Sequence, residues 1–140
     1  MKVVIKEIFK GTYDPSTNQV YNYTIIAQVE SEKEIKIFDL YGYDLQNYIG
    51  KEINCLLYPW IGKKLPGFVI EGEFIGRINL NQNWMKNNKD LDLDAYFGIK
   101  TIDGTFLVNT QDVKEFNLKK GEAVKFYADR VDLLSWHPID

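Results

Sequence analysis

The sequence predicts a small all-β domain with a minor helical component. With 140 residues, the chain has the length of one domain with a single core, or of two small barrels fused tightly. Two observations favour strands: apolar and polar residues alternate over 20–30, and short apolar segments recur along the whole chain. A third is the Asp103-Gly104 pair between two apolar segments, which is typical of a β-hairpin.

Five strands are predicted in the first 80 residues. In the clearest of them, over 20–30, every second residue is apolar, as in a strand with one buried face. Another, over 68–80, places Gly72 and Gly76 on its apolar face, where a barrel strand bends sharply. The remaining three are weaker and cover 2–10, 34–40 and 51–58.

The C-terminal part of the chain adds a hairpin and a long last strand. The hairpin joins strands over 95–102 and 105–109 through a type I′ turn, in which both central residues need a positive φ. The apolar residues of the last strand are Val124, Phe126 and Ala128, followed by Val131 and Leu133. Because their parity changes near Asp129 and Arg130, we predict a β-bulge there.

Two short helical turns are predicted, and each lies between strands. One ends before Gly50 and the other before Gly121, so the order strand, short helix, glycine, strand occurs at 35–58 and again at 105–128. The two glycines are 71 residues apart, and the strands that follow them match in apolar parity. This pattern indicates either an internal repeat or two glycines that are placed alike by chance.

The element order of residues 2–80 is three strands, a short helix and two more strands, and it resembles the OB-fold, a small Greek-key barrel. The resemblance rests on element order and on no sequence motif. It implies a five-stranded barrel with one short helix over 1–80. Residues 81–140 are then a loop with a partial second barrel, or an extension of the same sheet. An SH3-like barrel or a plain sandwich fits the same order.

Composition and charge narrow the classes of function. Seventeen Lys and Arg against twenty Asp and Glu give a net charge of −3, which disfavours nucleic acid as the partner. No segment approaches the roughly 20 apolar residues of a membrane span, and the first ten residues do not resemble a secretory signal. Cys55 is the only cysteine and His137 the only histidine, so neither a disulfide nor a zinc site is expected. We expect a cytoplasmic protein.

Candidate binding residues lie in and beside two loops. In the OB families that this chain resembles, the loops after the first and fourth strands lie beside the binding face. The corresponding loops here are 11–19 and 59–67, and the resemblance implies that their aromatic and lysine side chains converge. These candidates are Tyr13, Tyr58, Trp60, Lys63 and Lys64. Alternatively, Trp60 closes the open end of the barrel and the lysines are solvated loop charges.

The polar segment 81–93 is long for a loop in a compact domain and is a further candidate. It carries Trp84, which either packs onto the barrel as a plug or stays exposed for a partner. Asp90, Asp92 and Asp94 alternate with leucines and could offer carboxylates to calcium. Their spacing lacks the Gly and Glu of an EF-hand loop, so we predict an exposed acidic strand edge and no metal site.

Catalysis is not expected. The only imidazole, His137, lies near the end of the chain, where a histidine is usually solvated. The sequence contains no phosphate-binding glycine loop and no nucleophile elbow, so no cofactor is expected either. Glu71 and Glu73 share a strand face, and they leave a hydrolase as a third hypothesis.

The first hypothesis is a non-catalytic binding module that recognises a protein partner, as an adaptor or as an inhibitor of the immunity-protein kind. An acidic surface with aromatic anchors suits a desolvated contact with a basic protein. The alternative is a barrel that binds single-stranded nucleic acid or an oligosaccharide through the aromatic and lysine side chains of its loops.

Overall fold

A computed structural model describes residues 1–139 as eight strands, one α-helix and two 3₁₀ turns, which confirms the predicted all-β class with a minor helical component. The strands are β1 (Lys2–Lys10), β2 (Tyr23–Gln28), β3 (Glu34–Asp39), β4 (Glu52–Gly62), β5 (Phe68–Arg77), β6 (Phe97–Thr101), β7 (Gly104–Val108) and β8 (Ala123–Pro138). The helical elements are η1 (Gln46–Tyr48), η2 (Gln82–Lys86) and α1 (Thr110–Glu115). None of the helices within 1–139 has the length and apolar character needed to cross a membrane.

All eight strands form one sheet in the order β3-β2-β1-β4-β8-β5-β6-β7. β3 also pairs with β8, in parallel, at Phe38 and Asp132. This pairing closes β1, β2, β3, β4 and β8 into a five-stranded barrel, and β5, β6 and β7 continue the sheet beyond it. A small barrel was predicted, but its fifth strand is β8 and not the strand at 68–80. The reason is the length of β8, which pairs with β4 at one end and with β5 at the other.

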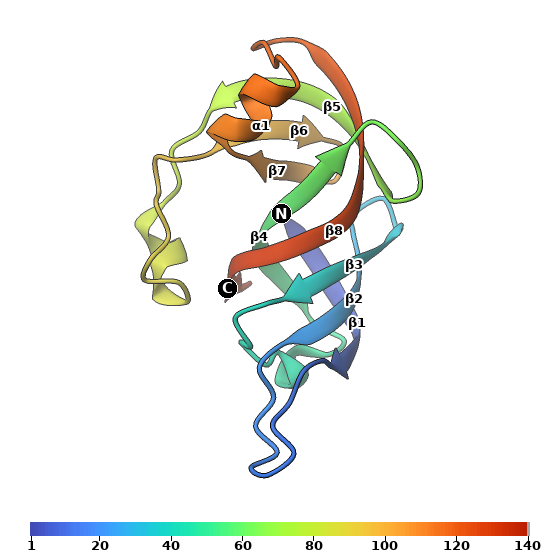
Figure 1. The fold of residues 1–140 in the computed structure, drawn as a ribbon, viewed down its shortest axis with the longest axis vertical. Coiled ribbons are helices and arrows are strands. Elements are labelled where there is room, and N and C mark those ends of the chain that lie inside the picture. Colours follow the sequence, from blue (N-terminus) through green and yellow to red (C-terminus); the bar gives the residue numbers. More distant parts are fainter. Residues whose placement is uncertain (140) are drawn as a thin grey trace.

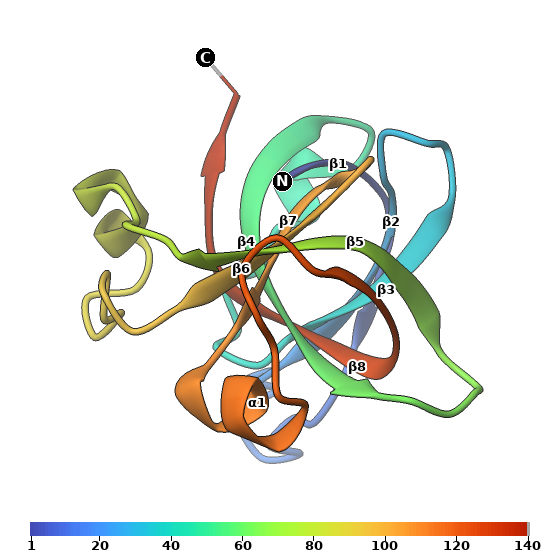
Figure 2. The same cartoon turned by 90° about the horizontal axis from the view of Figure 1, so that it is seen from above.

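The strands are arranged in two halves along the long axis of the molecule (Figure 1). β1, β2 and β3 lie in one half, β5, β6, β7 and α1 lie in the other, and β4 and β8 run between them. Seen from above, the segment with η2 stands out to one side (Figure 2). The expected division of the chain at residue 80 stays a prediction, because strand pairing alone does not define units that fold separately.

Alternating burial explains why these segments are strands. In β2, the side chains of Tyr23, Ile25 and Ala27 are buried, and the residues between them are only partly buried. The same alternation in β1 and β3 supplies Ile5 and Ile37 to one apolar cluster that extends through both halves of the molecule. A second, smaller cluster lies under the segment with η2 and contains Leu56, Leu91, Leu107 and Leu134.

The two halves repeat the same unit of three strands, a short helix and a fourth strand. Gly50 donates its backbone N–H to the carbonyl of Ile5 at 2.7 Å, and Gly121 donates to the carbonyl of Phe74 at 2.8 Å. A bulge follows Ile5 in β1, and a bulge follows Phe74 in β5. Of the two alternatives that the glycine spacing left open, these matches favour an internal repeat, in which β1 to β4 correspond to β5 to β8.

The two copies meet where β4 pairs with β8. In this ladder Pro59 is opposite Val131, and Trp60 is opposite Arg130. Gly50 and Gly121 are 71 residues apart, and the same separation relates Pro59 to Arg130 and Trp60 to Val131. Exchanging the two copies therefore converts one of these pairs into the other. The approximate two-fold relation between the copies therefore passes through the β4–β8 ladder beside Trp60 and Arg130.

Two local predictions need correction. β4 continues to Gly62, so Pro59 and Trp60 lie in a strand and not in a loop. β1 pairs with β4 only as far as Asn54, so a proline at position 59 interrupts no ladder on that side. The β6–β7 hairpin exists as predicted, but Thr101 pairs with Gly104, which leaves Ile102 and Asp103 as the central residues of the turn in place of the predicted Asp-Gly pair.

The last strand confirms the predicted bulge. Trp60 pairs with Arg130 and the next residue, Ile61, pairs with Ala128, so Asp129 has no partner on β4. A second bulge on β8 leaves Leu134 without a partner. Between the two bulges, the residues from Val131 to Leu134 are all buried, including Asp132.

The repeat predicts matched effects at its two glycines. Gly50 has φ of 84° and Gly121 has φ of 89°, a region in which a Cβ is unfavourable even though no atom lies within 4 Å of the added carbon. We expect Gly50→Ala and Gly121→Ala each to lower the free energy of unfolding by about 1–2 kcal/mol in urea titrations. Gly62 has equally open surroundings without positive φ. Gly62→Ala is the control, and a loss as large as that of the other two would contradict the backbone argument.

Candidate functional site

A cleft of about 890 Å³ opens beside the second half of β4. It is bounded by the loop between β4 and β5, by the start of α1, by the segment that leads into β6 and by the middle of β8. Four aromatic side chains line it, namely Tyr58, Trp60, Tyr96 and Tyr127. Apolar residues of β4, of the adjoining loop and of β8 complete the walls, including Ile61, Leu65, Pro66 and Leu134.

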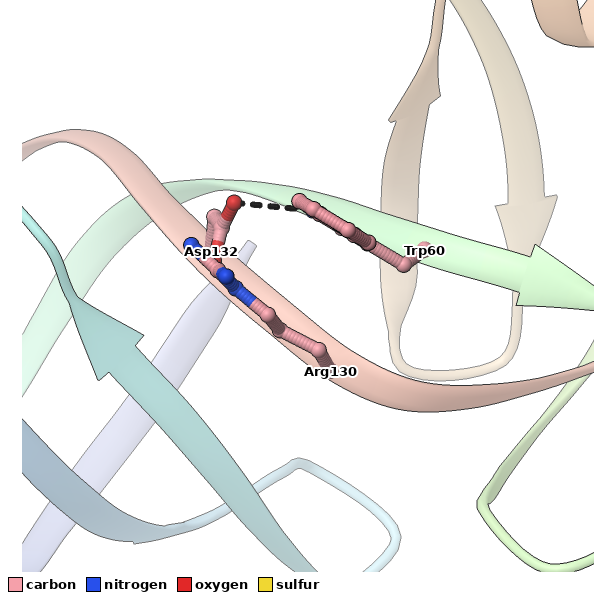
Figure 3. Close-up of polar contacts among 3 residues, drawn as sticks. All are labelled: Trp60, Arg130 and Asp132. Atoms are coloured by element: carbon pink, nitrogen blue, oxygen red, sulfur yellow. Dashed lines mark hydrogen bonds and ion pairs between the residues drawn. The ribbon is translucent and has the colours of Figure 1, made fainter.

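Trp60 stands at this cleft with 52% of its surface exposed, yet its ring is held on two sides. Its indole Nε1 donates to Oδ2 of Asp132 at 2.9 Å. The guanidinium of Arg130 lies 4.4 Å from the centre of the Trp60 ring, within the range of a cation–π contact. Figure 3 shows Trp60 on β4 facing Arg130 and Asp132 on β8.

Asp132 is the centre of this contact. It is only 6% exposed, and a carboxylate at such a position needs donors for both of its oxygens. Trp60 supplies one, and Nε of Arg130 supplies the other, at 2.7 Å from Oδ1. The guanidinium of Arg130 also lies 4.6 Å from the ring centre of Phe38 on β3. Since Phe38 and Asp132 form the bridge that closes the barrel, the same residues close the fold and orient Trp60.

The bulge at Asp129 explains how these side chains meet. Without it, alternation would place Asp132 on the same face of β8 as Phe126 and Ala128, which point into the core. The extra residue shifts the alternation, so Val131 and Leu133 enter the core and Asp132 turns towards β4 and the cleft. Asp129 itself lies exposed at the cleft.

A second polar network in the cleft wall joins β4 to the start of α1. The Tyr58 hydroxyl donates to Oδ2 of Asp112 at 2.8 Å and accepts from Nδ2 of Asn109 at 2.6 Å. Asn109 and Asp112 also form a capping box, in which each side chain accepts from the backbone N–H of the other at the start of α1. The first turn of α1 is thereby attached to β4, and Tyr58 is fixed in orientation.

The phenols of Tyr58 and Tyr96 remain neutral well above pH 7. Burial raises the pKa of Tyr58, and its hydrogen bond to Asp112 and the charge of that carboxylate raise it further. Burial also raises the pKa of Tyr96, whose ring lies 6.3 Å from that of Tyr58 in an edge-to-face arrangement. Both phenols therefore act as neutral hydrogen-bonding groups, and neither is activated as a nucleophile.

Charges in the cleft are unequal. Three carboxylates line it, those of Asp112, Asp129 and Asp132, against the single lysine Lys64. Within residues 1–139 the only ion pair is that of Arg130 with Asp132. No group of three or more His, Cys, Asp or Glu side chains in this part of the chain is placed to hold a metal ion.

The structure brings together three of the six predicted binding residues. Tyr58, Trp60 and Lys64 line the cleft. Lys63 lies outside it, with Nζ 5.9 Å from the ring centre of Phe116. Tyr13 pairs with Val20 in the connection between β1 and β2. This connection projects from one end of the molecule, and the β4–β5 loop lies in the other half (Figure 1). The predicted convergence of the two loops is therefore wrong.

Trp84 lies against the barrel and not in the cleft. It is half-buried on the second apolar cluster, with its ring 4.4 Å from that of His137. Its carbonyl accepts from the hydroxyl of Ser135 on β8. Asn87 and Asn88 donate to carbonyls of the same strand, so side-chain bonds attach this segment firmly to β8. A role of Trp84 in binding stays a prediction.

Several residues of the site were not among the sequence candidates. Arg130 and Asp132 lie at the predicted bulge, and the change of parity there was the available signal that one polar side chain would turn inward. Asn109 and Asp112 follow the spacing of a capping box before an apolar turn, which marks a helix start and not a site. Tyr96 had no local signal, because only the tertiary fold brings it to Tyr58.

Comparisons with other proteins add no family to this description. No family model matches the sequence, and neither a curated protein nor a solved structure gives a match to the chain.

The hydrogen bond from Trp60 to Asp132 predicts that removing this carboxylate lowers stability and exposes the indole N–H. Asp132→Ala leaves the indole N–H and the guanidinium without their acceptor, so we expect the free energy of unfolding to fall by about 1–3 kcal/mol. We also expect faster hydrogen exchange of the Trp60 indole N–H, measured by NMR after assignment with Trp60→Phe. Asp129→Ala is the control, because Asp129 is exposed. An indole exchange rate that does not change in Asp132→Ala would contradict the account.

Proposed function

We propose that this chain is a non-catalytic binding module that recognises a protein partner through the cleft beside Trp60. The observation that carries the proposal is the state of Trp60, which is half exposed and nevertheless held by Asp132 and Arg130. A large aromatic side chain that is already fixed loses little conformational entropy on binding. Tryptophan and tyrosine in such positions are the residue types that dominate protein interfaces.

The remaining walls of the cleft suit a protein segment. Leu65, Pro66 and Ile61 give apolar contact area next to Trp60. Tyr58 and Asn109 are bound to one another and to Asp112, so they present hydrogen-bonding groups in fixed positions. This combination of apolar walls with a few oriented polar groups is typical of a binding site. The acidic net charge of −3 favours a basic partner, as for an adaptor or an inhibitor of the immunity-protein kind.

A second function is favoured by a separate groove. The five-stranded barrel has the element order that resembles the OB-fold, with β8 in place of the fifth strand. Beside its β2 and β3 strands, a groove of about 300 Å³ is lined by Lys36, Phe38 and Arg130 among others. Two cations and an aromatic ring suit single-stranded nucleic acid, and the aromatic and polar cleft also suits an oligosaccharide. We rank both below a protein partner, because three carboxylates line the larger cleft.

The test is affinity capture of the tagged chain from lysate of its own source, with and without nuclease. We expect a stoichiometric protein that nuclease does not release, and we expect Trp60→Ala to reduce its retention by at least about tenfold. Tyr13→Ala is the matched control, because Tyr13 is 54% exposed and lies away from the cleft. It should retain the partner fully.

Two outcomes would contradict this function. Loss of all retained protein after nuclease treatment would favour the nucleic-acid alternative, and binding of an oligonucleotide would then weaken steeply as salt rises. Retention that depends on Tyr13 and not on Trp60 would place the site on the β1–β2 connection.

A further inference from the structure

We propose that the cleft binds an arginine side chain of the partner, an inference that rests on the proposed function. The cleft leaves negative charge on Asp112 and Asp129 uncompensated. Asp112 accepts from the Tyr58 hydroxyl and from the backbone N–H of Asn109, and both of these donors are neutral. Asp129 lies exposed at the bulge, and the only ion pair within residues 1–139 uses Asp132 instead.

The surroundings of Asp112 strengthen its attraction for a cation. Asp112 is half-buried in the first turn of α1, accepts a hydrogen bond from Tyr58 and lines the cleft. A cation that approaches a carboxylate in such surroundings is attracted more strongly than it would be in open water, because the local dielectric constant is lower. Lys64, the one lysine of the lining, lies exposed on the β4–β5 loop and makes no ion pair.

The aromatic lining selects the kind of cation. Tyr58 and Tyr96 meet edge to face, and Trp60 and Tyr127 lie at the same cleft. Aromatic faces next to carboxylates favour a planar guanidinium, which stacks on a ring and donates to a carboxylate at the same time. A lysine ammonium is a compact, strongly hydrated charge, and it cannot stack as a plane on a ring while it donates to a carboxylate.

The protein itself contains an example of this geometry. The guanidinium of Arg130 lies over the ring of Trp60 and donates to Asp132, while Trp60 donates to the same carboxylate. Tyr58 and Asp112 offer a second ring and a second carboxylate in hydrogen-bonding contact in the same cleft, without a guanidinium of this chain. The occupant that completes the second arrangement is an arginine of the partner.

The test compares a short glycine-arginine peptide with the same peptide carrying citrulline, which keeps the shape of arginine without its charge. Binding is followed by NMR, through the Trp60 indole and the ring signals of Tyr58. We expect the arginine peptide to bind about tenfold more tightly than the citrulline peptide, and a lysine peptide to lie between them. Raising the salt concentration should reduce the difference between the arginine and citrulline peptides.

Variants locate the binding. Asp129→Asn removes a charge without removing a hydrogen bond of the fold, and it should weaken the arginine peptide about threefold or more. Asp112→Asn should weaken it further, and its stability is measured alongside, because Asp112 also caps α1. Asp90→Asn is the control, since Asp90 is exposed and lies outside the cleft lining. It should leave the affinity unchanged.

The outcomes separate this inference from the proposed function. Equal binding of the arginine and citrulline peptides, or binding that Asp129→Asn and Asp90→Asn weaken alike, would overturn the arginine inference. The same holds if neither peptide shifts the signals of Trp60 or Tyr58. In each case, a protein that is captured through Trp60 would still support the binding module. Loss of the Trp60 dependence in the capture experiment would overturn the module itself.

Discussion

The pairing of β4 with β8 is the interaction on which the rest of the structure depends. β4 contributes to this ladder from Ile53 to Gly62, and β8 continues past it to pair with β5. β8 thereby closes the barrel against β3 and attaches the second copy of the repeat. The cleft lies along the same ladder, so strand pairing positions Tyr58, Trp60 and Asp132 within it, and the β4–β5 loop and the start of α1 complete its walls.

The two bulges of β8 decide which side chains the ladder presents. Each adds a residue without a partner, first Asp129 and then Leu134, and each shifts the alternation of buried and outward positions. The first shift turns Asp132 towards Trp60. The second returns Trp136 to the main apolar cluster and turns Ser135 to the segment with η2, where its hydroxyl donates to the carbonyl of Trp84. The two copies share their order of strands, and irregular residues of this kind give the β4–β8 junction its distinct chemistry.

Strand positions could be predicted from the sequence because apolar and polar residues alternate clearly in β2 and in β5. The bulge at Asp129 was predictable for the same reason, since a change of parity is visible without a structure. The partner of β8 was not, because pairing between distant strands leaves no local pattern. The sequence predicts an end of β4 before Pro59, because proline is unfavourable within a paired strand. β4 continues to Gly62, since β1 does not pair with it beyond Asn54.

The candidate site was predictable only in part. Trp60, Tyr58 and Lys64 were found as aromatic and basic residues near one strand end, and they do share a cleft. Tyr13 was grouped with them on the assumption that two loops converge, and this failed because the β1–β2 connection points away from the cleft. The carboxylates of the cleft could not be predicted, because Asp112 on α1 and Asp132 on β8 are distant in sequence from Tyr58 and Trp60. Only the tertiary fold brings them together.

The most direct test is cross-saturation NMR on this chain in complex with a protein that the affinity experiment captures, which maps the surface that such a protein covers. We predict that saturation reaches the side chains of Tyr58, Trp60 and Tyr96 and leaves the connection between β1 and β2 unaffected. Saturation confined to residues 11–22 would contradict the central claim, because the partner would then contact neither the β4–β8 ladder nor its cleft.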